Sequence, residues 1–258
     1  MSPVSWRTTR GDDPIVATAI HAGHDLRVEV KELMKLPEVD RLREEDPFTD
    51  LWVGIAANQV IVDNSRFELD LNRPRDRAVY LERADAWGLD VWESPVPAAV
   101  HERSLSLYDQ FYAEIGQLCD EIVESHGVVV VLDLHSYNHR RQGPVAQVDD
   151  PALNPEINLG TATINPVWLP AVEVFKEAIG ELPFFDAHLD VRENVKFTGG
   201  HLSKWVNARY GERGFAVAVE MKKIFMDEWS GVLDEAITGS ISEILHVATD
   251  AVRGEISS

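Results

Sequence analysis

The sequence of 258 residues contains a single cysteine, Cys119. One cysteine can form neither an intrachain disulfide nor a thiolate metal site by itself. Because Cys119 lies in an amphipathic stretch, we expect it to be a small core residue. No apolar run approaches the ~20 residues that cross a bilayer. The first residues also lack the charged-then-apolar order of a signal peptide. These features predict a soluble cytoplasmic protein.

Basic residues are also scarce, with 24 Lys and Arg against 44 Asp and Glu, which gives a net charge of -20. Nucleic acid binding requires a basic surface that faces the phosphates, so we expect no nucleic acid partner. An anionic membrane surface is disfavoured for the same reason. Any anionic substrate of this acidic protein would need a local basic pocket.

Hydrophobic residues make up 45% of the chain, as in ordinary globular proteins. We find no internal repeat, no low-complexity tract and no long linker, and the prolines near 95–97 and 144–155 are typical of loops. The length lies at the upper end of the range for one domain. We therefore expect one domain that covers residues 1–258.

Short apolar runs alternate with amphipathic stretches along the chain. The four consecutive valines of 128–134 (VVVVLDL) are typical of a strand that is buried on both faces. Strands are also predicted at 14–20, 58–70 (with a turn) and 215–220. Helices are predicted at 26–45 with a break at Pro37, and at 103–126, 166–180, 201–210 and 232–252. This alternation predicts an α/β fold, with a mixed central sheet between two layers of helices.

Three of the predicted strands end in polar residues that could carry chemistry. His21 follows the first, Asp133 and His135 end the strand of valines, and Glu220 ends the last. In open α/β sheets, ligands bind beyond the carboxyl ends of the strands. We therefore expect these side chains to lie close together, with their strands adjacent near the middle of the sheet.

Histidines dominate two of these strand ends. His21 and His24 are three residues apart, and two imidazoles in one turn could bind a common Zn²⁺, although such pairs are often incidental. Asp133 lies two residues before His135, on the same face of the strand, and could orient its ring. The alternative for His135 is a core histidine that a neighbouring carboxylate satisfies.

A third element is the sequence DLNRP at 70–74. Arg73 offers a planar pair of donors that matches a carboxylate, and Asn72 can add a hydrogen bond. The alternative is a surface ion pair before a proline turn.

Taken in order, these elements resemble the arrangement of zinc carboxypeptidases and, more closely, that of the N-formylglutamate amidohydrolase family. The resemblance extends from residue 14 to residue 228. It is carried by the stretches IHAGHD (20–25), EEDPFTDLW (44–52), SRFELDLNRP (65–74), VVLDLHSYNHR (130–140), NVKFTGGHLSKWVNARYG (194–211) and AVAVEMKKIFMDE (216–228). It implies a three-layer, phosphorylase/hydrolase-like α/β fold.

The resemblance also implies a metal site. His21 and His135 would bind one Zn²⁺, and the third ligand would be either His24 or an acidic residue at Glu45 or Asp46. Glu220 would act as the general base in the hydrolysis of a linear amide. The alternative for Glu220 is an ion pair with Lys222, two residues further along the strand.

For the substrate, the resemblance implies a small anionic N-acyl amino acid such as N-formylglutamate. Arg73, Asn72 and Arg66 would hold a carboxylate, and His201, at a helix start, would contact a carboxylate or the developing oxyanion. Asp70 would support His21. Another deacylase, a small zinc peptidase or a non-catalytic binding protein are the alternatives, and the sequence indicates no oligomeric state.

Overall fold

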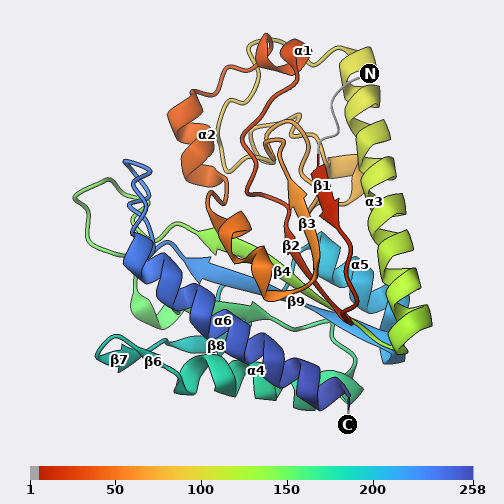
Figure 1. Ribbon diagram of the computed structural model, residues 1–258. Coiled ribbons are helices and arrows are strands. Elements are labelled where there is room, and N and C mark those ends of the chain that lie inside the picture. Colours follow the sequence, from red (N-terminus) through yellow and green to blue (C-terminus); the bar gives the residue numbers. More distant parts are fainter. Residues whose placement is uncertain (1–5, 258) are drawn as a thin grey trace.

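A seven-stranded mixed sheet runs through the centre of the computed structural model, which describes residues 6–257 (Figure 1). Strands β3, β2, β4 and β9 are mutually parallel, whereas β1 is antiparallel to β3, and β5 is antiparallel to β9 and parallel to β8. In spatial order, the strands are β1 (Trp6–Thr9), β3 (Asn58–Val62), β2 (Ile15–Ala19), β4 (Val129–Tyr137), β9 (Gly214–Lys222), β5 (Ile157–Gly160) and β8 (Val191–Glu193). The predicted mixed sheet is therefore confirmed.

Helices cover both faces of this sheet. One face packs against α3 (Ala98–His126) and α5 (His201–Tyr210), and the other against α4 (Leu169–Glu181) and α6 (Glu235–Ile256). The connection between β2 and β3 carries two short helices, α1 (Val28–Lys31) and α2 (Glu38–Glu44), and the 3₁₀ helix η1 (Thr49–Ile55). A small hairpin of β6 (Pro183–Phe184) and β7 (Ala187–His188) lies outside the main sheet. The three-layer α/β architecture agrees with the prediction.

The run of valines in β4 serves both helical layers. Val129 and Val131 belong to the core beneath α3 and α5, and Val130 and Leu132 to the core beneath α4 and α6. Since successive strand residues point to opposite faces, a central strand between two helical layers must be apolar at every position. This requirement explains why the strongest strand signal in the sequence belongs to the middle of the sheet.

Strands β4 and β9 continue beyond their predicted ends. They pair in parallel along nine residues each, from Val129 opposite Gly214 to Tyr137 opposite Lys222. His135 and Glu220 therefore lie within their strands and not at the ends, and they are direct neighbours in the ladder. The order β2, β4, β9 also makes these strands adjacent at the middle of the sheet, as we predicted.

Several boundaries differ from the sequence-based expectation. α3 begins at Ala98 and not at 103, because the proline-containing segment up to Pro97 leads directly into the helix. The predicted helix 26–45 is two short helices, and Pro37 immediately precedes the second one. The strands β1, β5 and β8 and the β6–β7 hairpin were not predicted, because each strand has four residues or fewer and no long apolar run.

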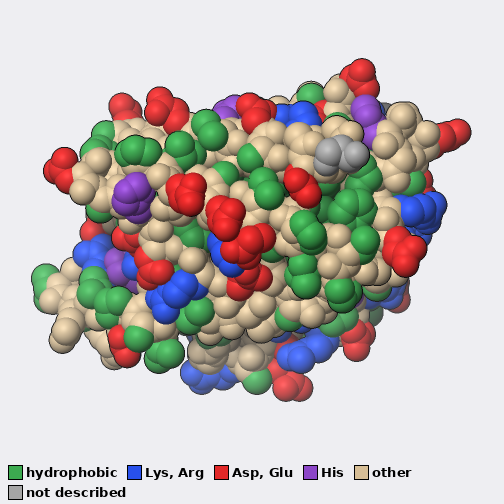
Figure 2. Space-filling model, turned by 90° about the horizontal axis from the view of Figure 1, so that it is seen from below, with side chains coloured by type: hydrophobic (Ala, Val, Ile, Leu, Met, Phe, Trp, Pro, Cys, Tyr) green, Lys and Arg blue, Asp and Glu red, His purple; other side chains and the backbone are tan. Residues whose placement is uncertain are grey.

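Two expectations about composition can be compared with the structure. Cys119 is fully buried in the core beneath α3, and burial raises the pKa of its thiol to about 12, so it is an unreactive core residue as expected. Among the described residues, no helix has the length and apolarity that crossing a membrane requires. Acidic side chains are spread over the face seen in Figure 2, in accordance with the net charge of -20.

The close pairing of β4 and β9 predicts a specific sensitivity at Gly214. A Cβ atom at Gly214 would lie 2.3 Å from the carbonyl oxygen of Val129, so Gly214→Ala must displace backbone. We expect a loss of about 1–3 kcal/mol in the free energy of unfolding, measured by urea denaturation. The control is Gly239→Ala in α6, where no atom lies within 4 Å and alanine should add about 1 kcal/mol. Unchanged stability of Gly214→Ala would contradict the described register.

Candidate functional site

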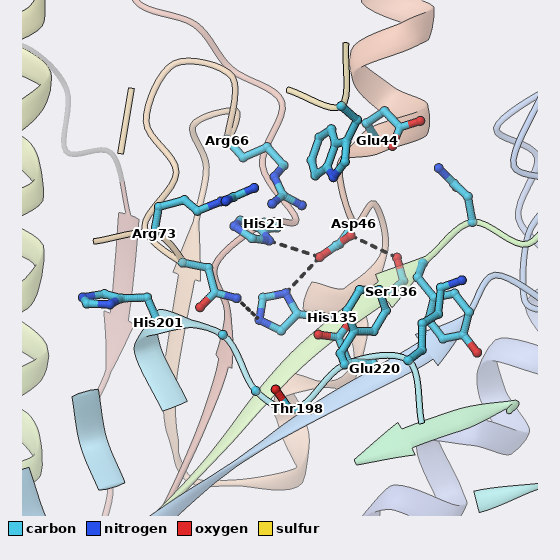
Figure 3. A pocket seen from close by; sticks show the side chains of 18 of the residues that line it. His21, Glu44, Asp46, Arg66, Arg73, His135, Ser136, Thr198, His201 and Glu220 are labelled. Atoms are coloured by element: carbon cyan, nitrogen blue, oxygen red, sulfur yellow. Dashed lines mark hydrogen bonds and ion pairs between the residues drawn. The ribbon is translucent and has the colours of Figure 1, made fainter. Parts of the chain in front are cut away.

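The carboxyl ends of β2, β4 and β9 open into a cavity of about 570 Å³ (Figure 3). Its wall combines acidic, basic and imidazole side chains with aromatic rings. The residues that form it include His21, Glu44, Asp46, Arg66, Asn72, Arg73, Trp87, His135, Tyr137, Arg141, Lys196, His201, Lys204, Glu220 and Lys223. The cavity thus collects residues from segments that lie far apart in the sequence.

His21, Asp46 and His135 form a buried group at the base of this cavity. Their potential ligand atoms all lie within 4.8 Å of one another. Nδ1 of His21 is 3.4 Å from Oδ2 of Asp46, and Nδ1 of His135 is 3.0 Å from the same oxygen. Nδ1 of His21 is buried without a hydrogen-bond partner. Two nitrogen atoms and one carboxylate oxygen match the donor set of a zinc site with an open fourth position.

A carboxylate faces the other nitrogen of each imidazole. Nε2 of His21 lies 2.7 Å from Oδ1 of Asp70, and Nε2 of His135 lies 3.0 Å from Oδ2 of Asp133. Thr18 donates a hydrogen bond of 2.7 Å to Asp133 and fixes that carboxylate in turn. A carboxylate at Nε2 favours the tautomer that makes the Nδ1 lone pair available, an arrangement that would suit a metal ion at Nδ1.

The electrostatics of the group also favour a cation. Burial alone would raise the pKa of Asp46, but the hydrogen bond from His135 and the nearby imidazole of His21 lower it strongly. Burial likewise opposes the charged form of His135, yet Asp133, Asp46 and Glu220 raise its pKa well above the usual value. Buried carboxylates that crowd around two imidazoles create a strongly negative potential, which either protons or a metal ion can compensate.

The structure distinguishes between the candidates for the third ligand. Asp46 follows α2, and its backbone N–H donates to the carbonyl oxygen of His21 at 3.0 Å, which holds its side chain in the group. His24 is not brought into the group, since its two nitrogens contact Glu45 at 2.5 Å and Glu38 at 3.2 Å. Glu45 faces away from the group and also accepts a hydrogen bond from Ser65.

Glu220 lies beside His135 in the β4–β9 ladder, at the wall of the cavity. It is only 8% exposed, and among residues 6–257 no hydrogen bond or ion pair engages its carboxylate. Burial raises its pKa to about 7, and the positive charge of His135 opposes this shift. The alternative ion pair with Lys222 is not formed, because that amine donates to the carbonyl oxygen of Asn154 at 3.0 Å.

Arg66 and Arg73 share Asp70 on one side of the cavity. Nη2 of Arg66 lies 2.9 Å from Oδ2 of Asp70, and Nε of Arg73 lies 3.7 Å from the same oxygen. The Arg66 guanidinium also packs over the ring of Trp87 at 5.0 Å. The Arg73 side chain is 31% exposed, against 13% for Arg66. Arg73 therefore retains donors that face the cavity, whereas Arg66 is more fully engaged.

Asn72 connects the metal-ligand candidates to α5. Its side-chain oxygen accepts a hydrogen bond of 3.0 Å from the backbone N–H of Leu202, and its backbone oxygen accepts one of 3.2 Å from His201. Its Nδ2 lies 3.3 Å from Nε2 of His135. His201 opens α5 as predicted, beside Tyr112 at a ring distance of 5.6 Å. Burial, assisted by Lys204, lowers the pKa of His201, which favours the neutral ring at pH 7.

Some residues of the cavity wall were given no role in the sequence analysis. Lys196 lies within the conspicuous stretch NVKFTGG but has no partner pattern of its own, and Trp87 and Tyr137 resemble ordinary core aromatics in the sequence. Arg141 also lines the cavity, where it forms an ion pair of 3.1 Å with Glu44, whereas Arg140 pairs with Asp227 outside the cavity. The only feature of the sequence that could have indicated a role for Lys196 is its position shortly before Gly199 and Gly200, which lead into α5.

Comparison with solved structures finds similar folds. An N-formylglutamate amidohydrolase from Ralstonia eutropha JMP134 aligns with a TM-score of 0.76 and 16% identity, and the alignment covers 98% of each chain. A gene product of Agrobacterium tumefaciens aligns with a TM-score of 0.67 and 18% identity, over 98% of this chain and 95% of that one. A metallo-carboxypeptidase from Burkholderia cenocepacia aligns with a TM-score of only 0.39 and 15% identity, over 95% and 57%.

Comparison of the sequence with curated proteins finds no significant match. Comparison with protein families finds N-formylglutamate amidohydrolase, over residues 13–226. This range includes every residue of the buried group, both arginines and Glu220, and it covers most of the chain. The chain therefore belongs to the N-formylglutamate amidohydrolase family.

Proposed function

We propose that this protein is a Zn²⁺-dependent amidohydrolase that cleaves the formyl amide of a small anionic N-formyl amino acid such as N-formylglutamate. One observation carries the proposal: a buried His-Asp-His group lies directly beside the carboxylate of Glu220, which forms no hydrogen bond or ion pair with any residue of the described range 6–257. Membership of the family, and the name of the Ralstonia relative, support this choice of substrate.

His21, Asp46 and His135 would hold the metal ion through Nδ1, Oδ2 and Nδ1. Bound zinc would supply Lewis acidity to the amide carbonyl and to the attacking water. Asp70 and Asp133 would keep the two imidazoles in the orientation and tautomer that ligation requires.

Glu220 would move the proton. It takes a proton from the attacking water as the water oxygen bonds to the formyl carbon. It then delivers this proton to the amide nitrogen, the C–N bond breaks, and formate and the free amino acid result. Burial favours both roles, because it raises the pKa of Glu220 above the usual carboxyl range, toward the pH at which a group accepts and releases a proton readily.

The substrate carboxylate would bind to Arg73, whose guanidinium can donate two parallel hydrogen bonds. Arg66 adds positive charge from the same side, and Asp70 holds both guanidinium groups in place. His201 lies near Arg73 at the start of α5 (Figure 3), where its neutral ring could donate a hydrogen bond and the helix N-terminus favours a negatively charged group. Asn72 would position His201 and the helix through its two hydrogen bonds.

The metal assignment predicts one zinc ion per chain. His135→Ala and Asp46→Asn should weaken zinc binding by more than the roughly 10–100-fold that loss of a supporting residue costs. His24→Ala is the matched control and should retain zinc, because His24 contacts Glu45 and Glu38 instead. Titration against a competing chelator measures the affinity. Stoichiometric zinc in His135→Ala after dialysis, or equal loss in His24→Ala and Asp46→Asn, would refute the assignment.

The role of Glu220 predicts a separation of binding from turnover. Glu220→Gln preserves shape, so the variant should keep its zinc and its KM, while kcat falls by roughly 10²–10⁴. The base must be deprotonated to act, so wild-type kcat/KM should rise with pH through the pKa of Glu220. This pKa is about 7 without metal and falls when a cation binds nearby. The variant should lose this acidic limb. Full activity of Glu220→Gln would assign the base elsewhere.

The carboxylate clamp predicts a KM effect at Arg73. Arg73→Lys keeps the charge but loses the planar pair of donors, so KM should rise by about tenfold with a smaller change in kcat. Arg75→Lys is the control, since Arg75 is exposed and pairs with Asp109 outside the cavity. Steady-state kinetics with an N-formyl amino acid and its α-carboxamide measure the effect. Equal kinetics of the two compounds with the wild-type enzyme would exclude the clamp.

A further inference from the structure

The basic side chains of the cavity differ in how their charge is compensated. Arg66 and Arg73 face Asp70, and Arg141 pairs with Glu44. Lys223 is buried and donates to two backbone carbonyl oxygens. Lys204 is exposed on α5, where water solvates its charge. Among the described cavity residues, neither Lys196 nor the fully buried Lys223 forms an ion pair, and of these two only Lys196 is partly exposed.

The amine of Lys196 has neutral neighbours. It donates a hydrogen bond to Oδ1 of Asn154 and lies over the ring of Tyr137 at 4.9 Å and that of Phe197 at 5.9 Å. Aromatic faces attract a cation but do not neutralise it. Asp149, Arg141, Glu220 and Glu228 act on it only through space, and none of them lies at ion-pair distance. A carboxylate that entered the cavity would supply the missing counter-charge.

The backbone that carries Lys196 is held in place from the sheet. Oδ1 of the fully buried Asn158 accepts hydrogen bonds from the backbone N–H groups of Val195 at 3.0 Å and Lys196 at 2.8 Å. Its Nδ2 donates to the carbonyl oxygen of Phe197 at 2.8 Å. Asn158 is also the partner of Glu220 in the β5–β9 ladder. The position of Lys196 is therefore fixed relative to the proposed base.

The loop that carries Lys196 and Thr198 lies on one side of the proposed metal group, and Arg66 lies on the other side. Thr198, two residues further along the same loop, and Arg66 lie on opposite sides of His135 in Figure 3. A ligand whose amide is placed at His21 and His135 thus has a cationic wall on each side. Arg73 would take the carboxylate on the α carbon, and a side chain of glutamate length, which leaves the same carbon, could turn away from Arg73 and extend along the cavity to the second wall.

We propose that Lys196 is a specificity-determining residue that binds the side-chain carboxylate of a dicarboxylic N-acyl amino acid. This inference rests on the proposed function and adds to it the part of the site that distinguishes acidic from neutral side chains. The amine of Lys196 keeps its contacts with Asn154 and the ring of Tyr137, and the side-chain carboxylate of the ligand adds a hydrogen bond and the counter-charge.

The test compares N-formyl-L-glutamate with N-formyl-L-glutamine, which has the same shape without the charge. Lys196→Met should lower kcat/KM for the glutamate compound by about 10- to 100-fold, mainly through KM, because a hydrogen bond between charged groups is lost. Activity on the glutamine compound should change by less than about threefold. Lys196→Arg should retain the preference for glutamate. Lys35→Met, an exposed site outside the cavity, controls for the change in net charge.

Loss of activity on both compounds to the same degree, or no loss on either, would overturn the role of Lys196. Calorimetric binding of both compounds to Glu220→Gln and to the Glu220→Gln, Lys196→Met double variant gives a second readout without turnover. A wild-type enzyme that hydrolyses neither compound would overturn the proposed function. In that case, selective binding of the glutamate compound that disappears with Lys196 still supports the subsite, and unselective binding refutes it.

Discussion

The parallel pairing of β4 with β9 is the constraint on which the candidate site depends. It holds His135 opposite Glu220 in the ladder and turns both side chains toward the face that α5 covers. Nine residue pairs fix this register, and Gly214 permits its close start at Val129. A shift of β9 by one residue relative to β4 would move the side chains of β9 to the opposite face of the sheet. Glu220 would then be separated from His135. The chemistry of the site is thus a property of the core of the sheet and not of a surface loop.

The sequence was most informative where burial imposes a long pattern. The valines of β4 and the apolar run of β9 revealed the middle of the sheet, and with it His135 and Glu220, because strands buried on both faces must be apolar throughout. His21 was found through the same logic at the end of β2. The short strands β5 and β8 escaped detection, since three or four residues carry no periodic signal. Their position became evident only from their pairing with β9 and with each other.

The details of the site that remained open depend on loop geometry. The sequence could not decide between His24, Glu45 and Asp46, because neighbouring residues of a loop point in directions that only the path of the backbone determines. In the structure, the hydrogen bond from the backbone N–H of Asp46 to the carbonyl oxygen of His21 holds Asp46 beside the two imidazoles, whereas Glu45 accepts a hydrogen bond from Ser65. Lys196 is a similar case, as its position follows from Asn158 on a neighbouring strand, far from it in sequence.

Asp70 has a consequence for the energetics of the whole site, because one carboxylate serves two purposes. Its Oδ1 faces His21, and its Oδ2 faces Arg66 and Arg73. A substrate carboxylate that binds to Arg73 takes up part of the positive charge that otherwise compensates Asp70. Asp70 then polarises His21 more strongly, which makes the imidazole a better electron donor to a metal ion. Under the proposed function, metal affinity and substrate affinity would thereby be thermodynamically linked, and by reciprocity each ligand would strengthen the binding of the other.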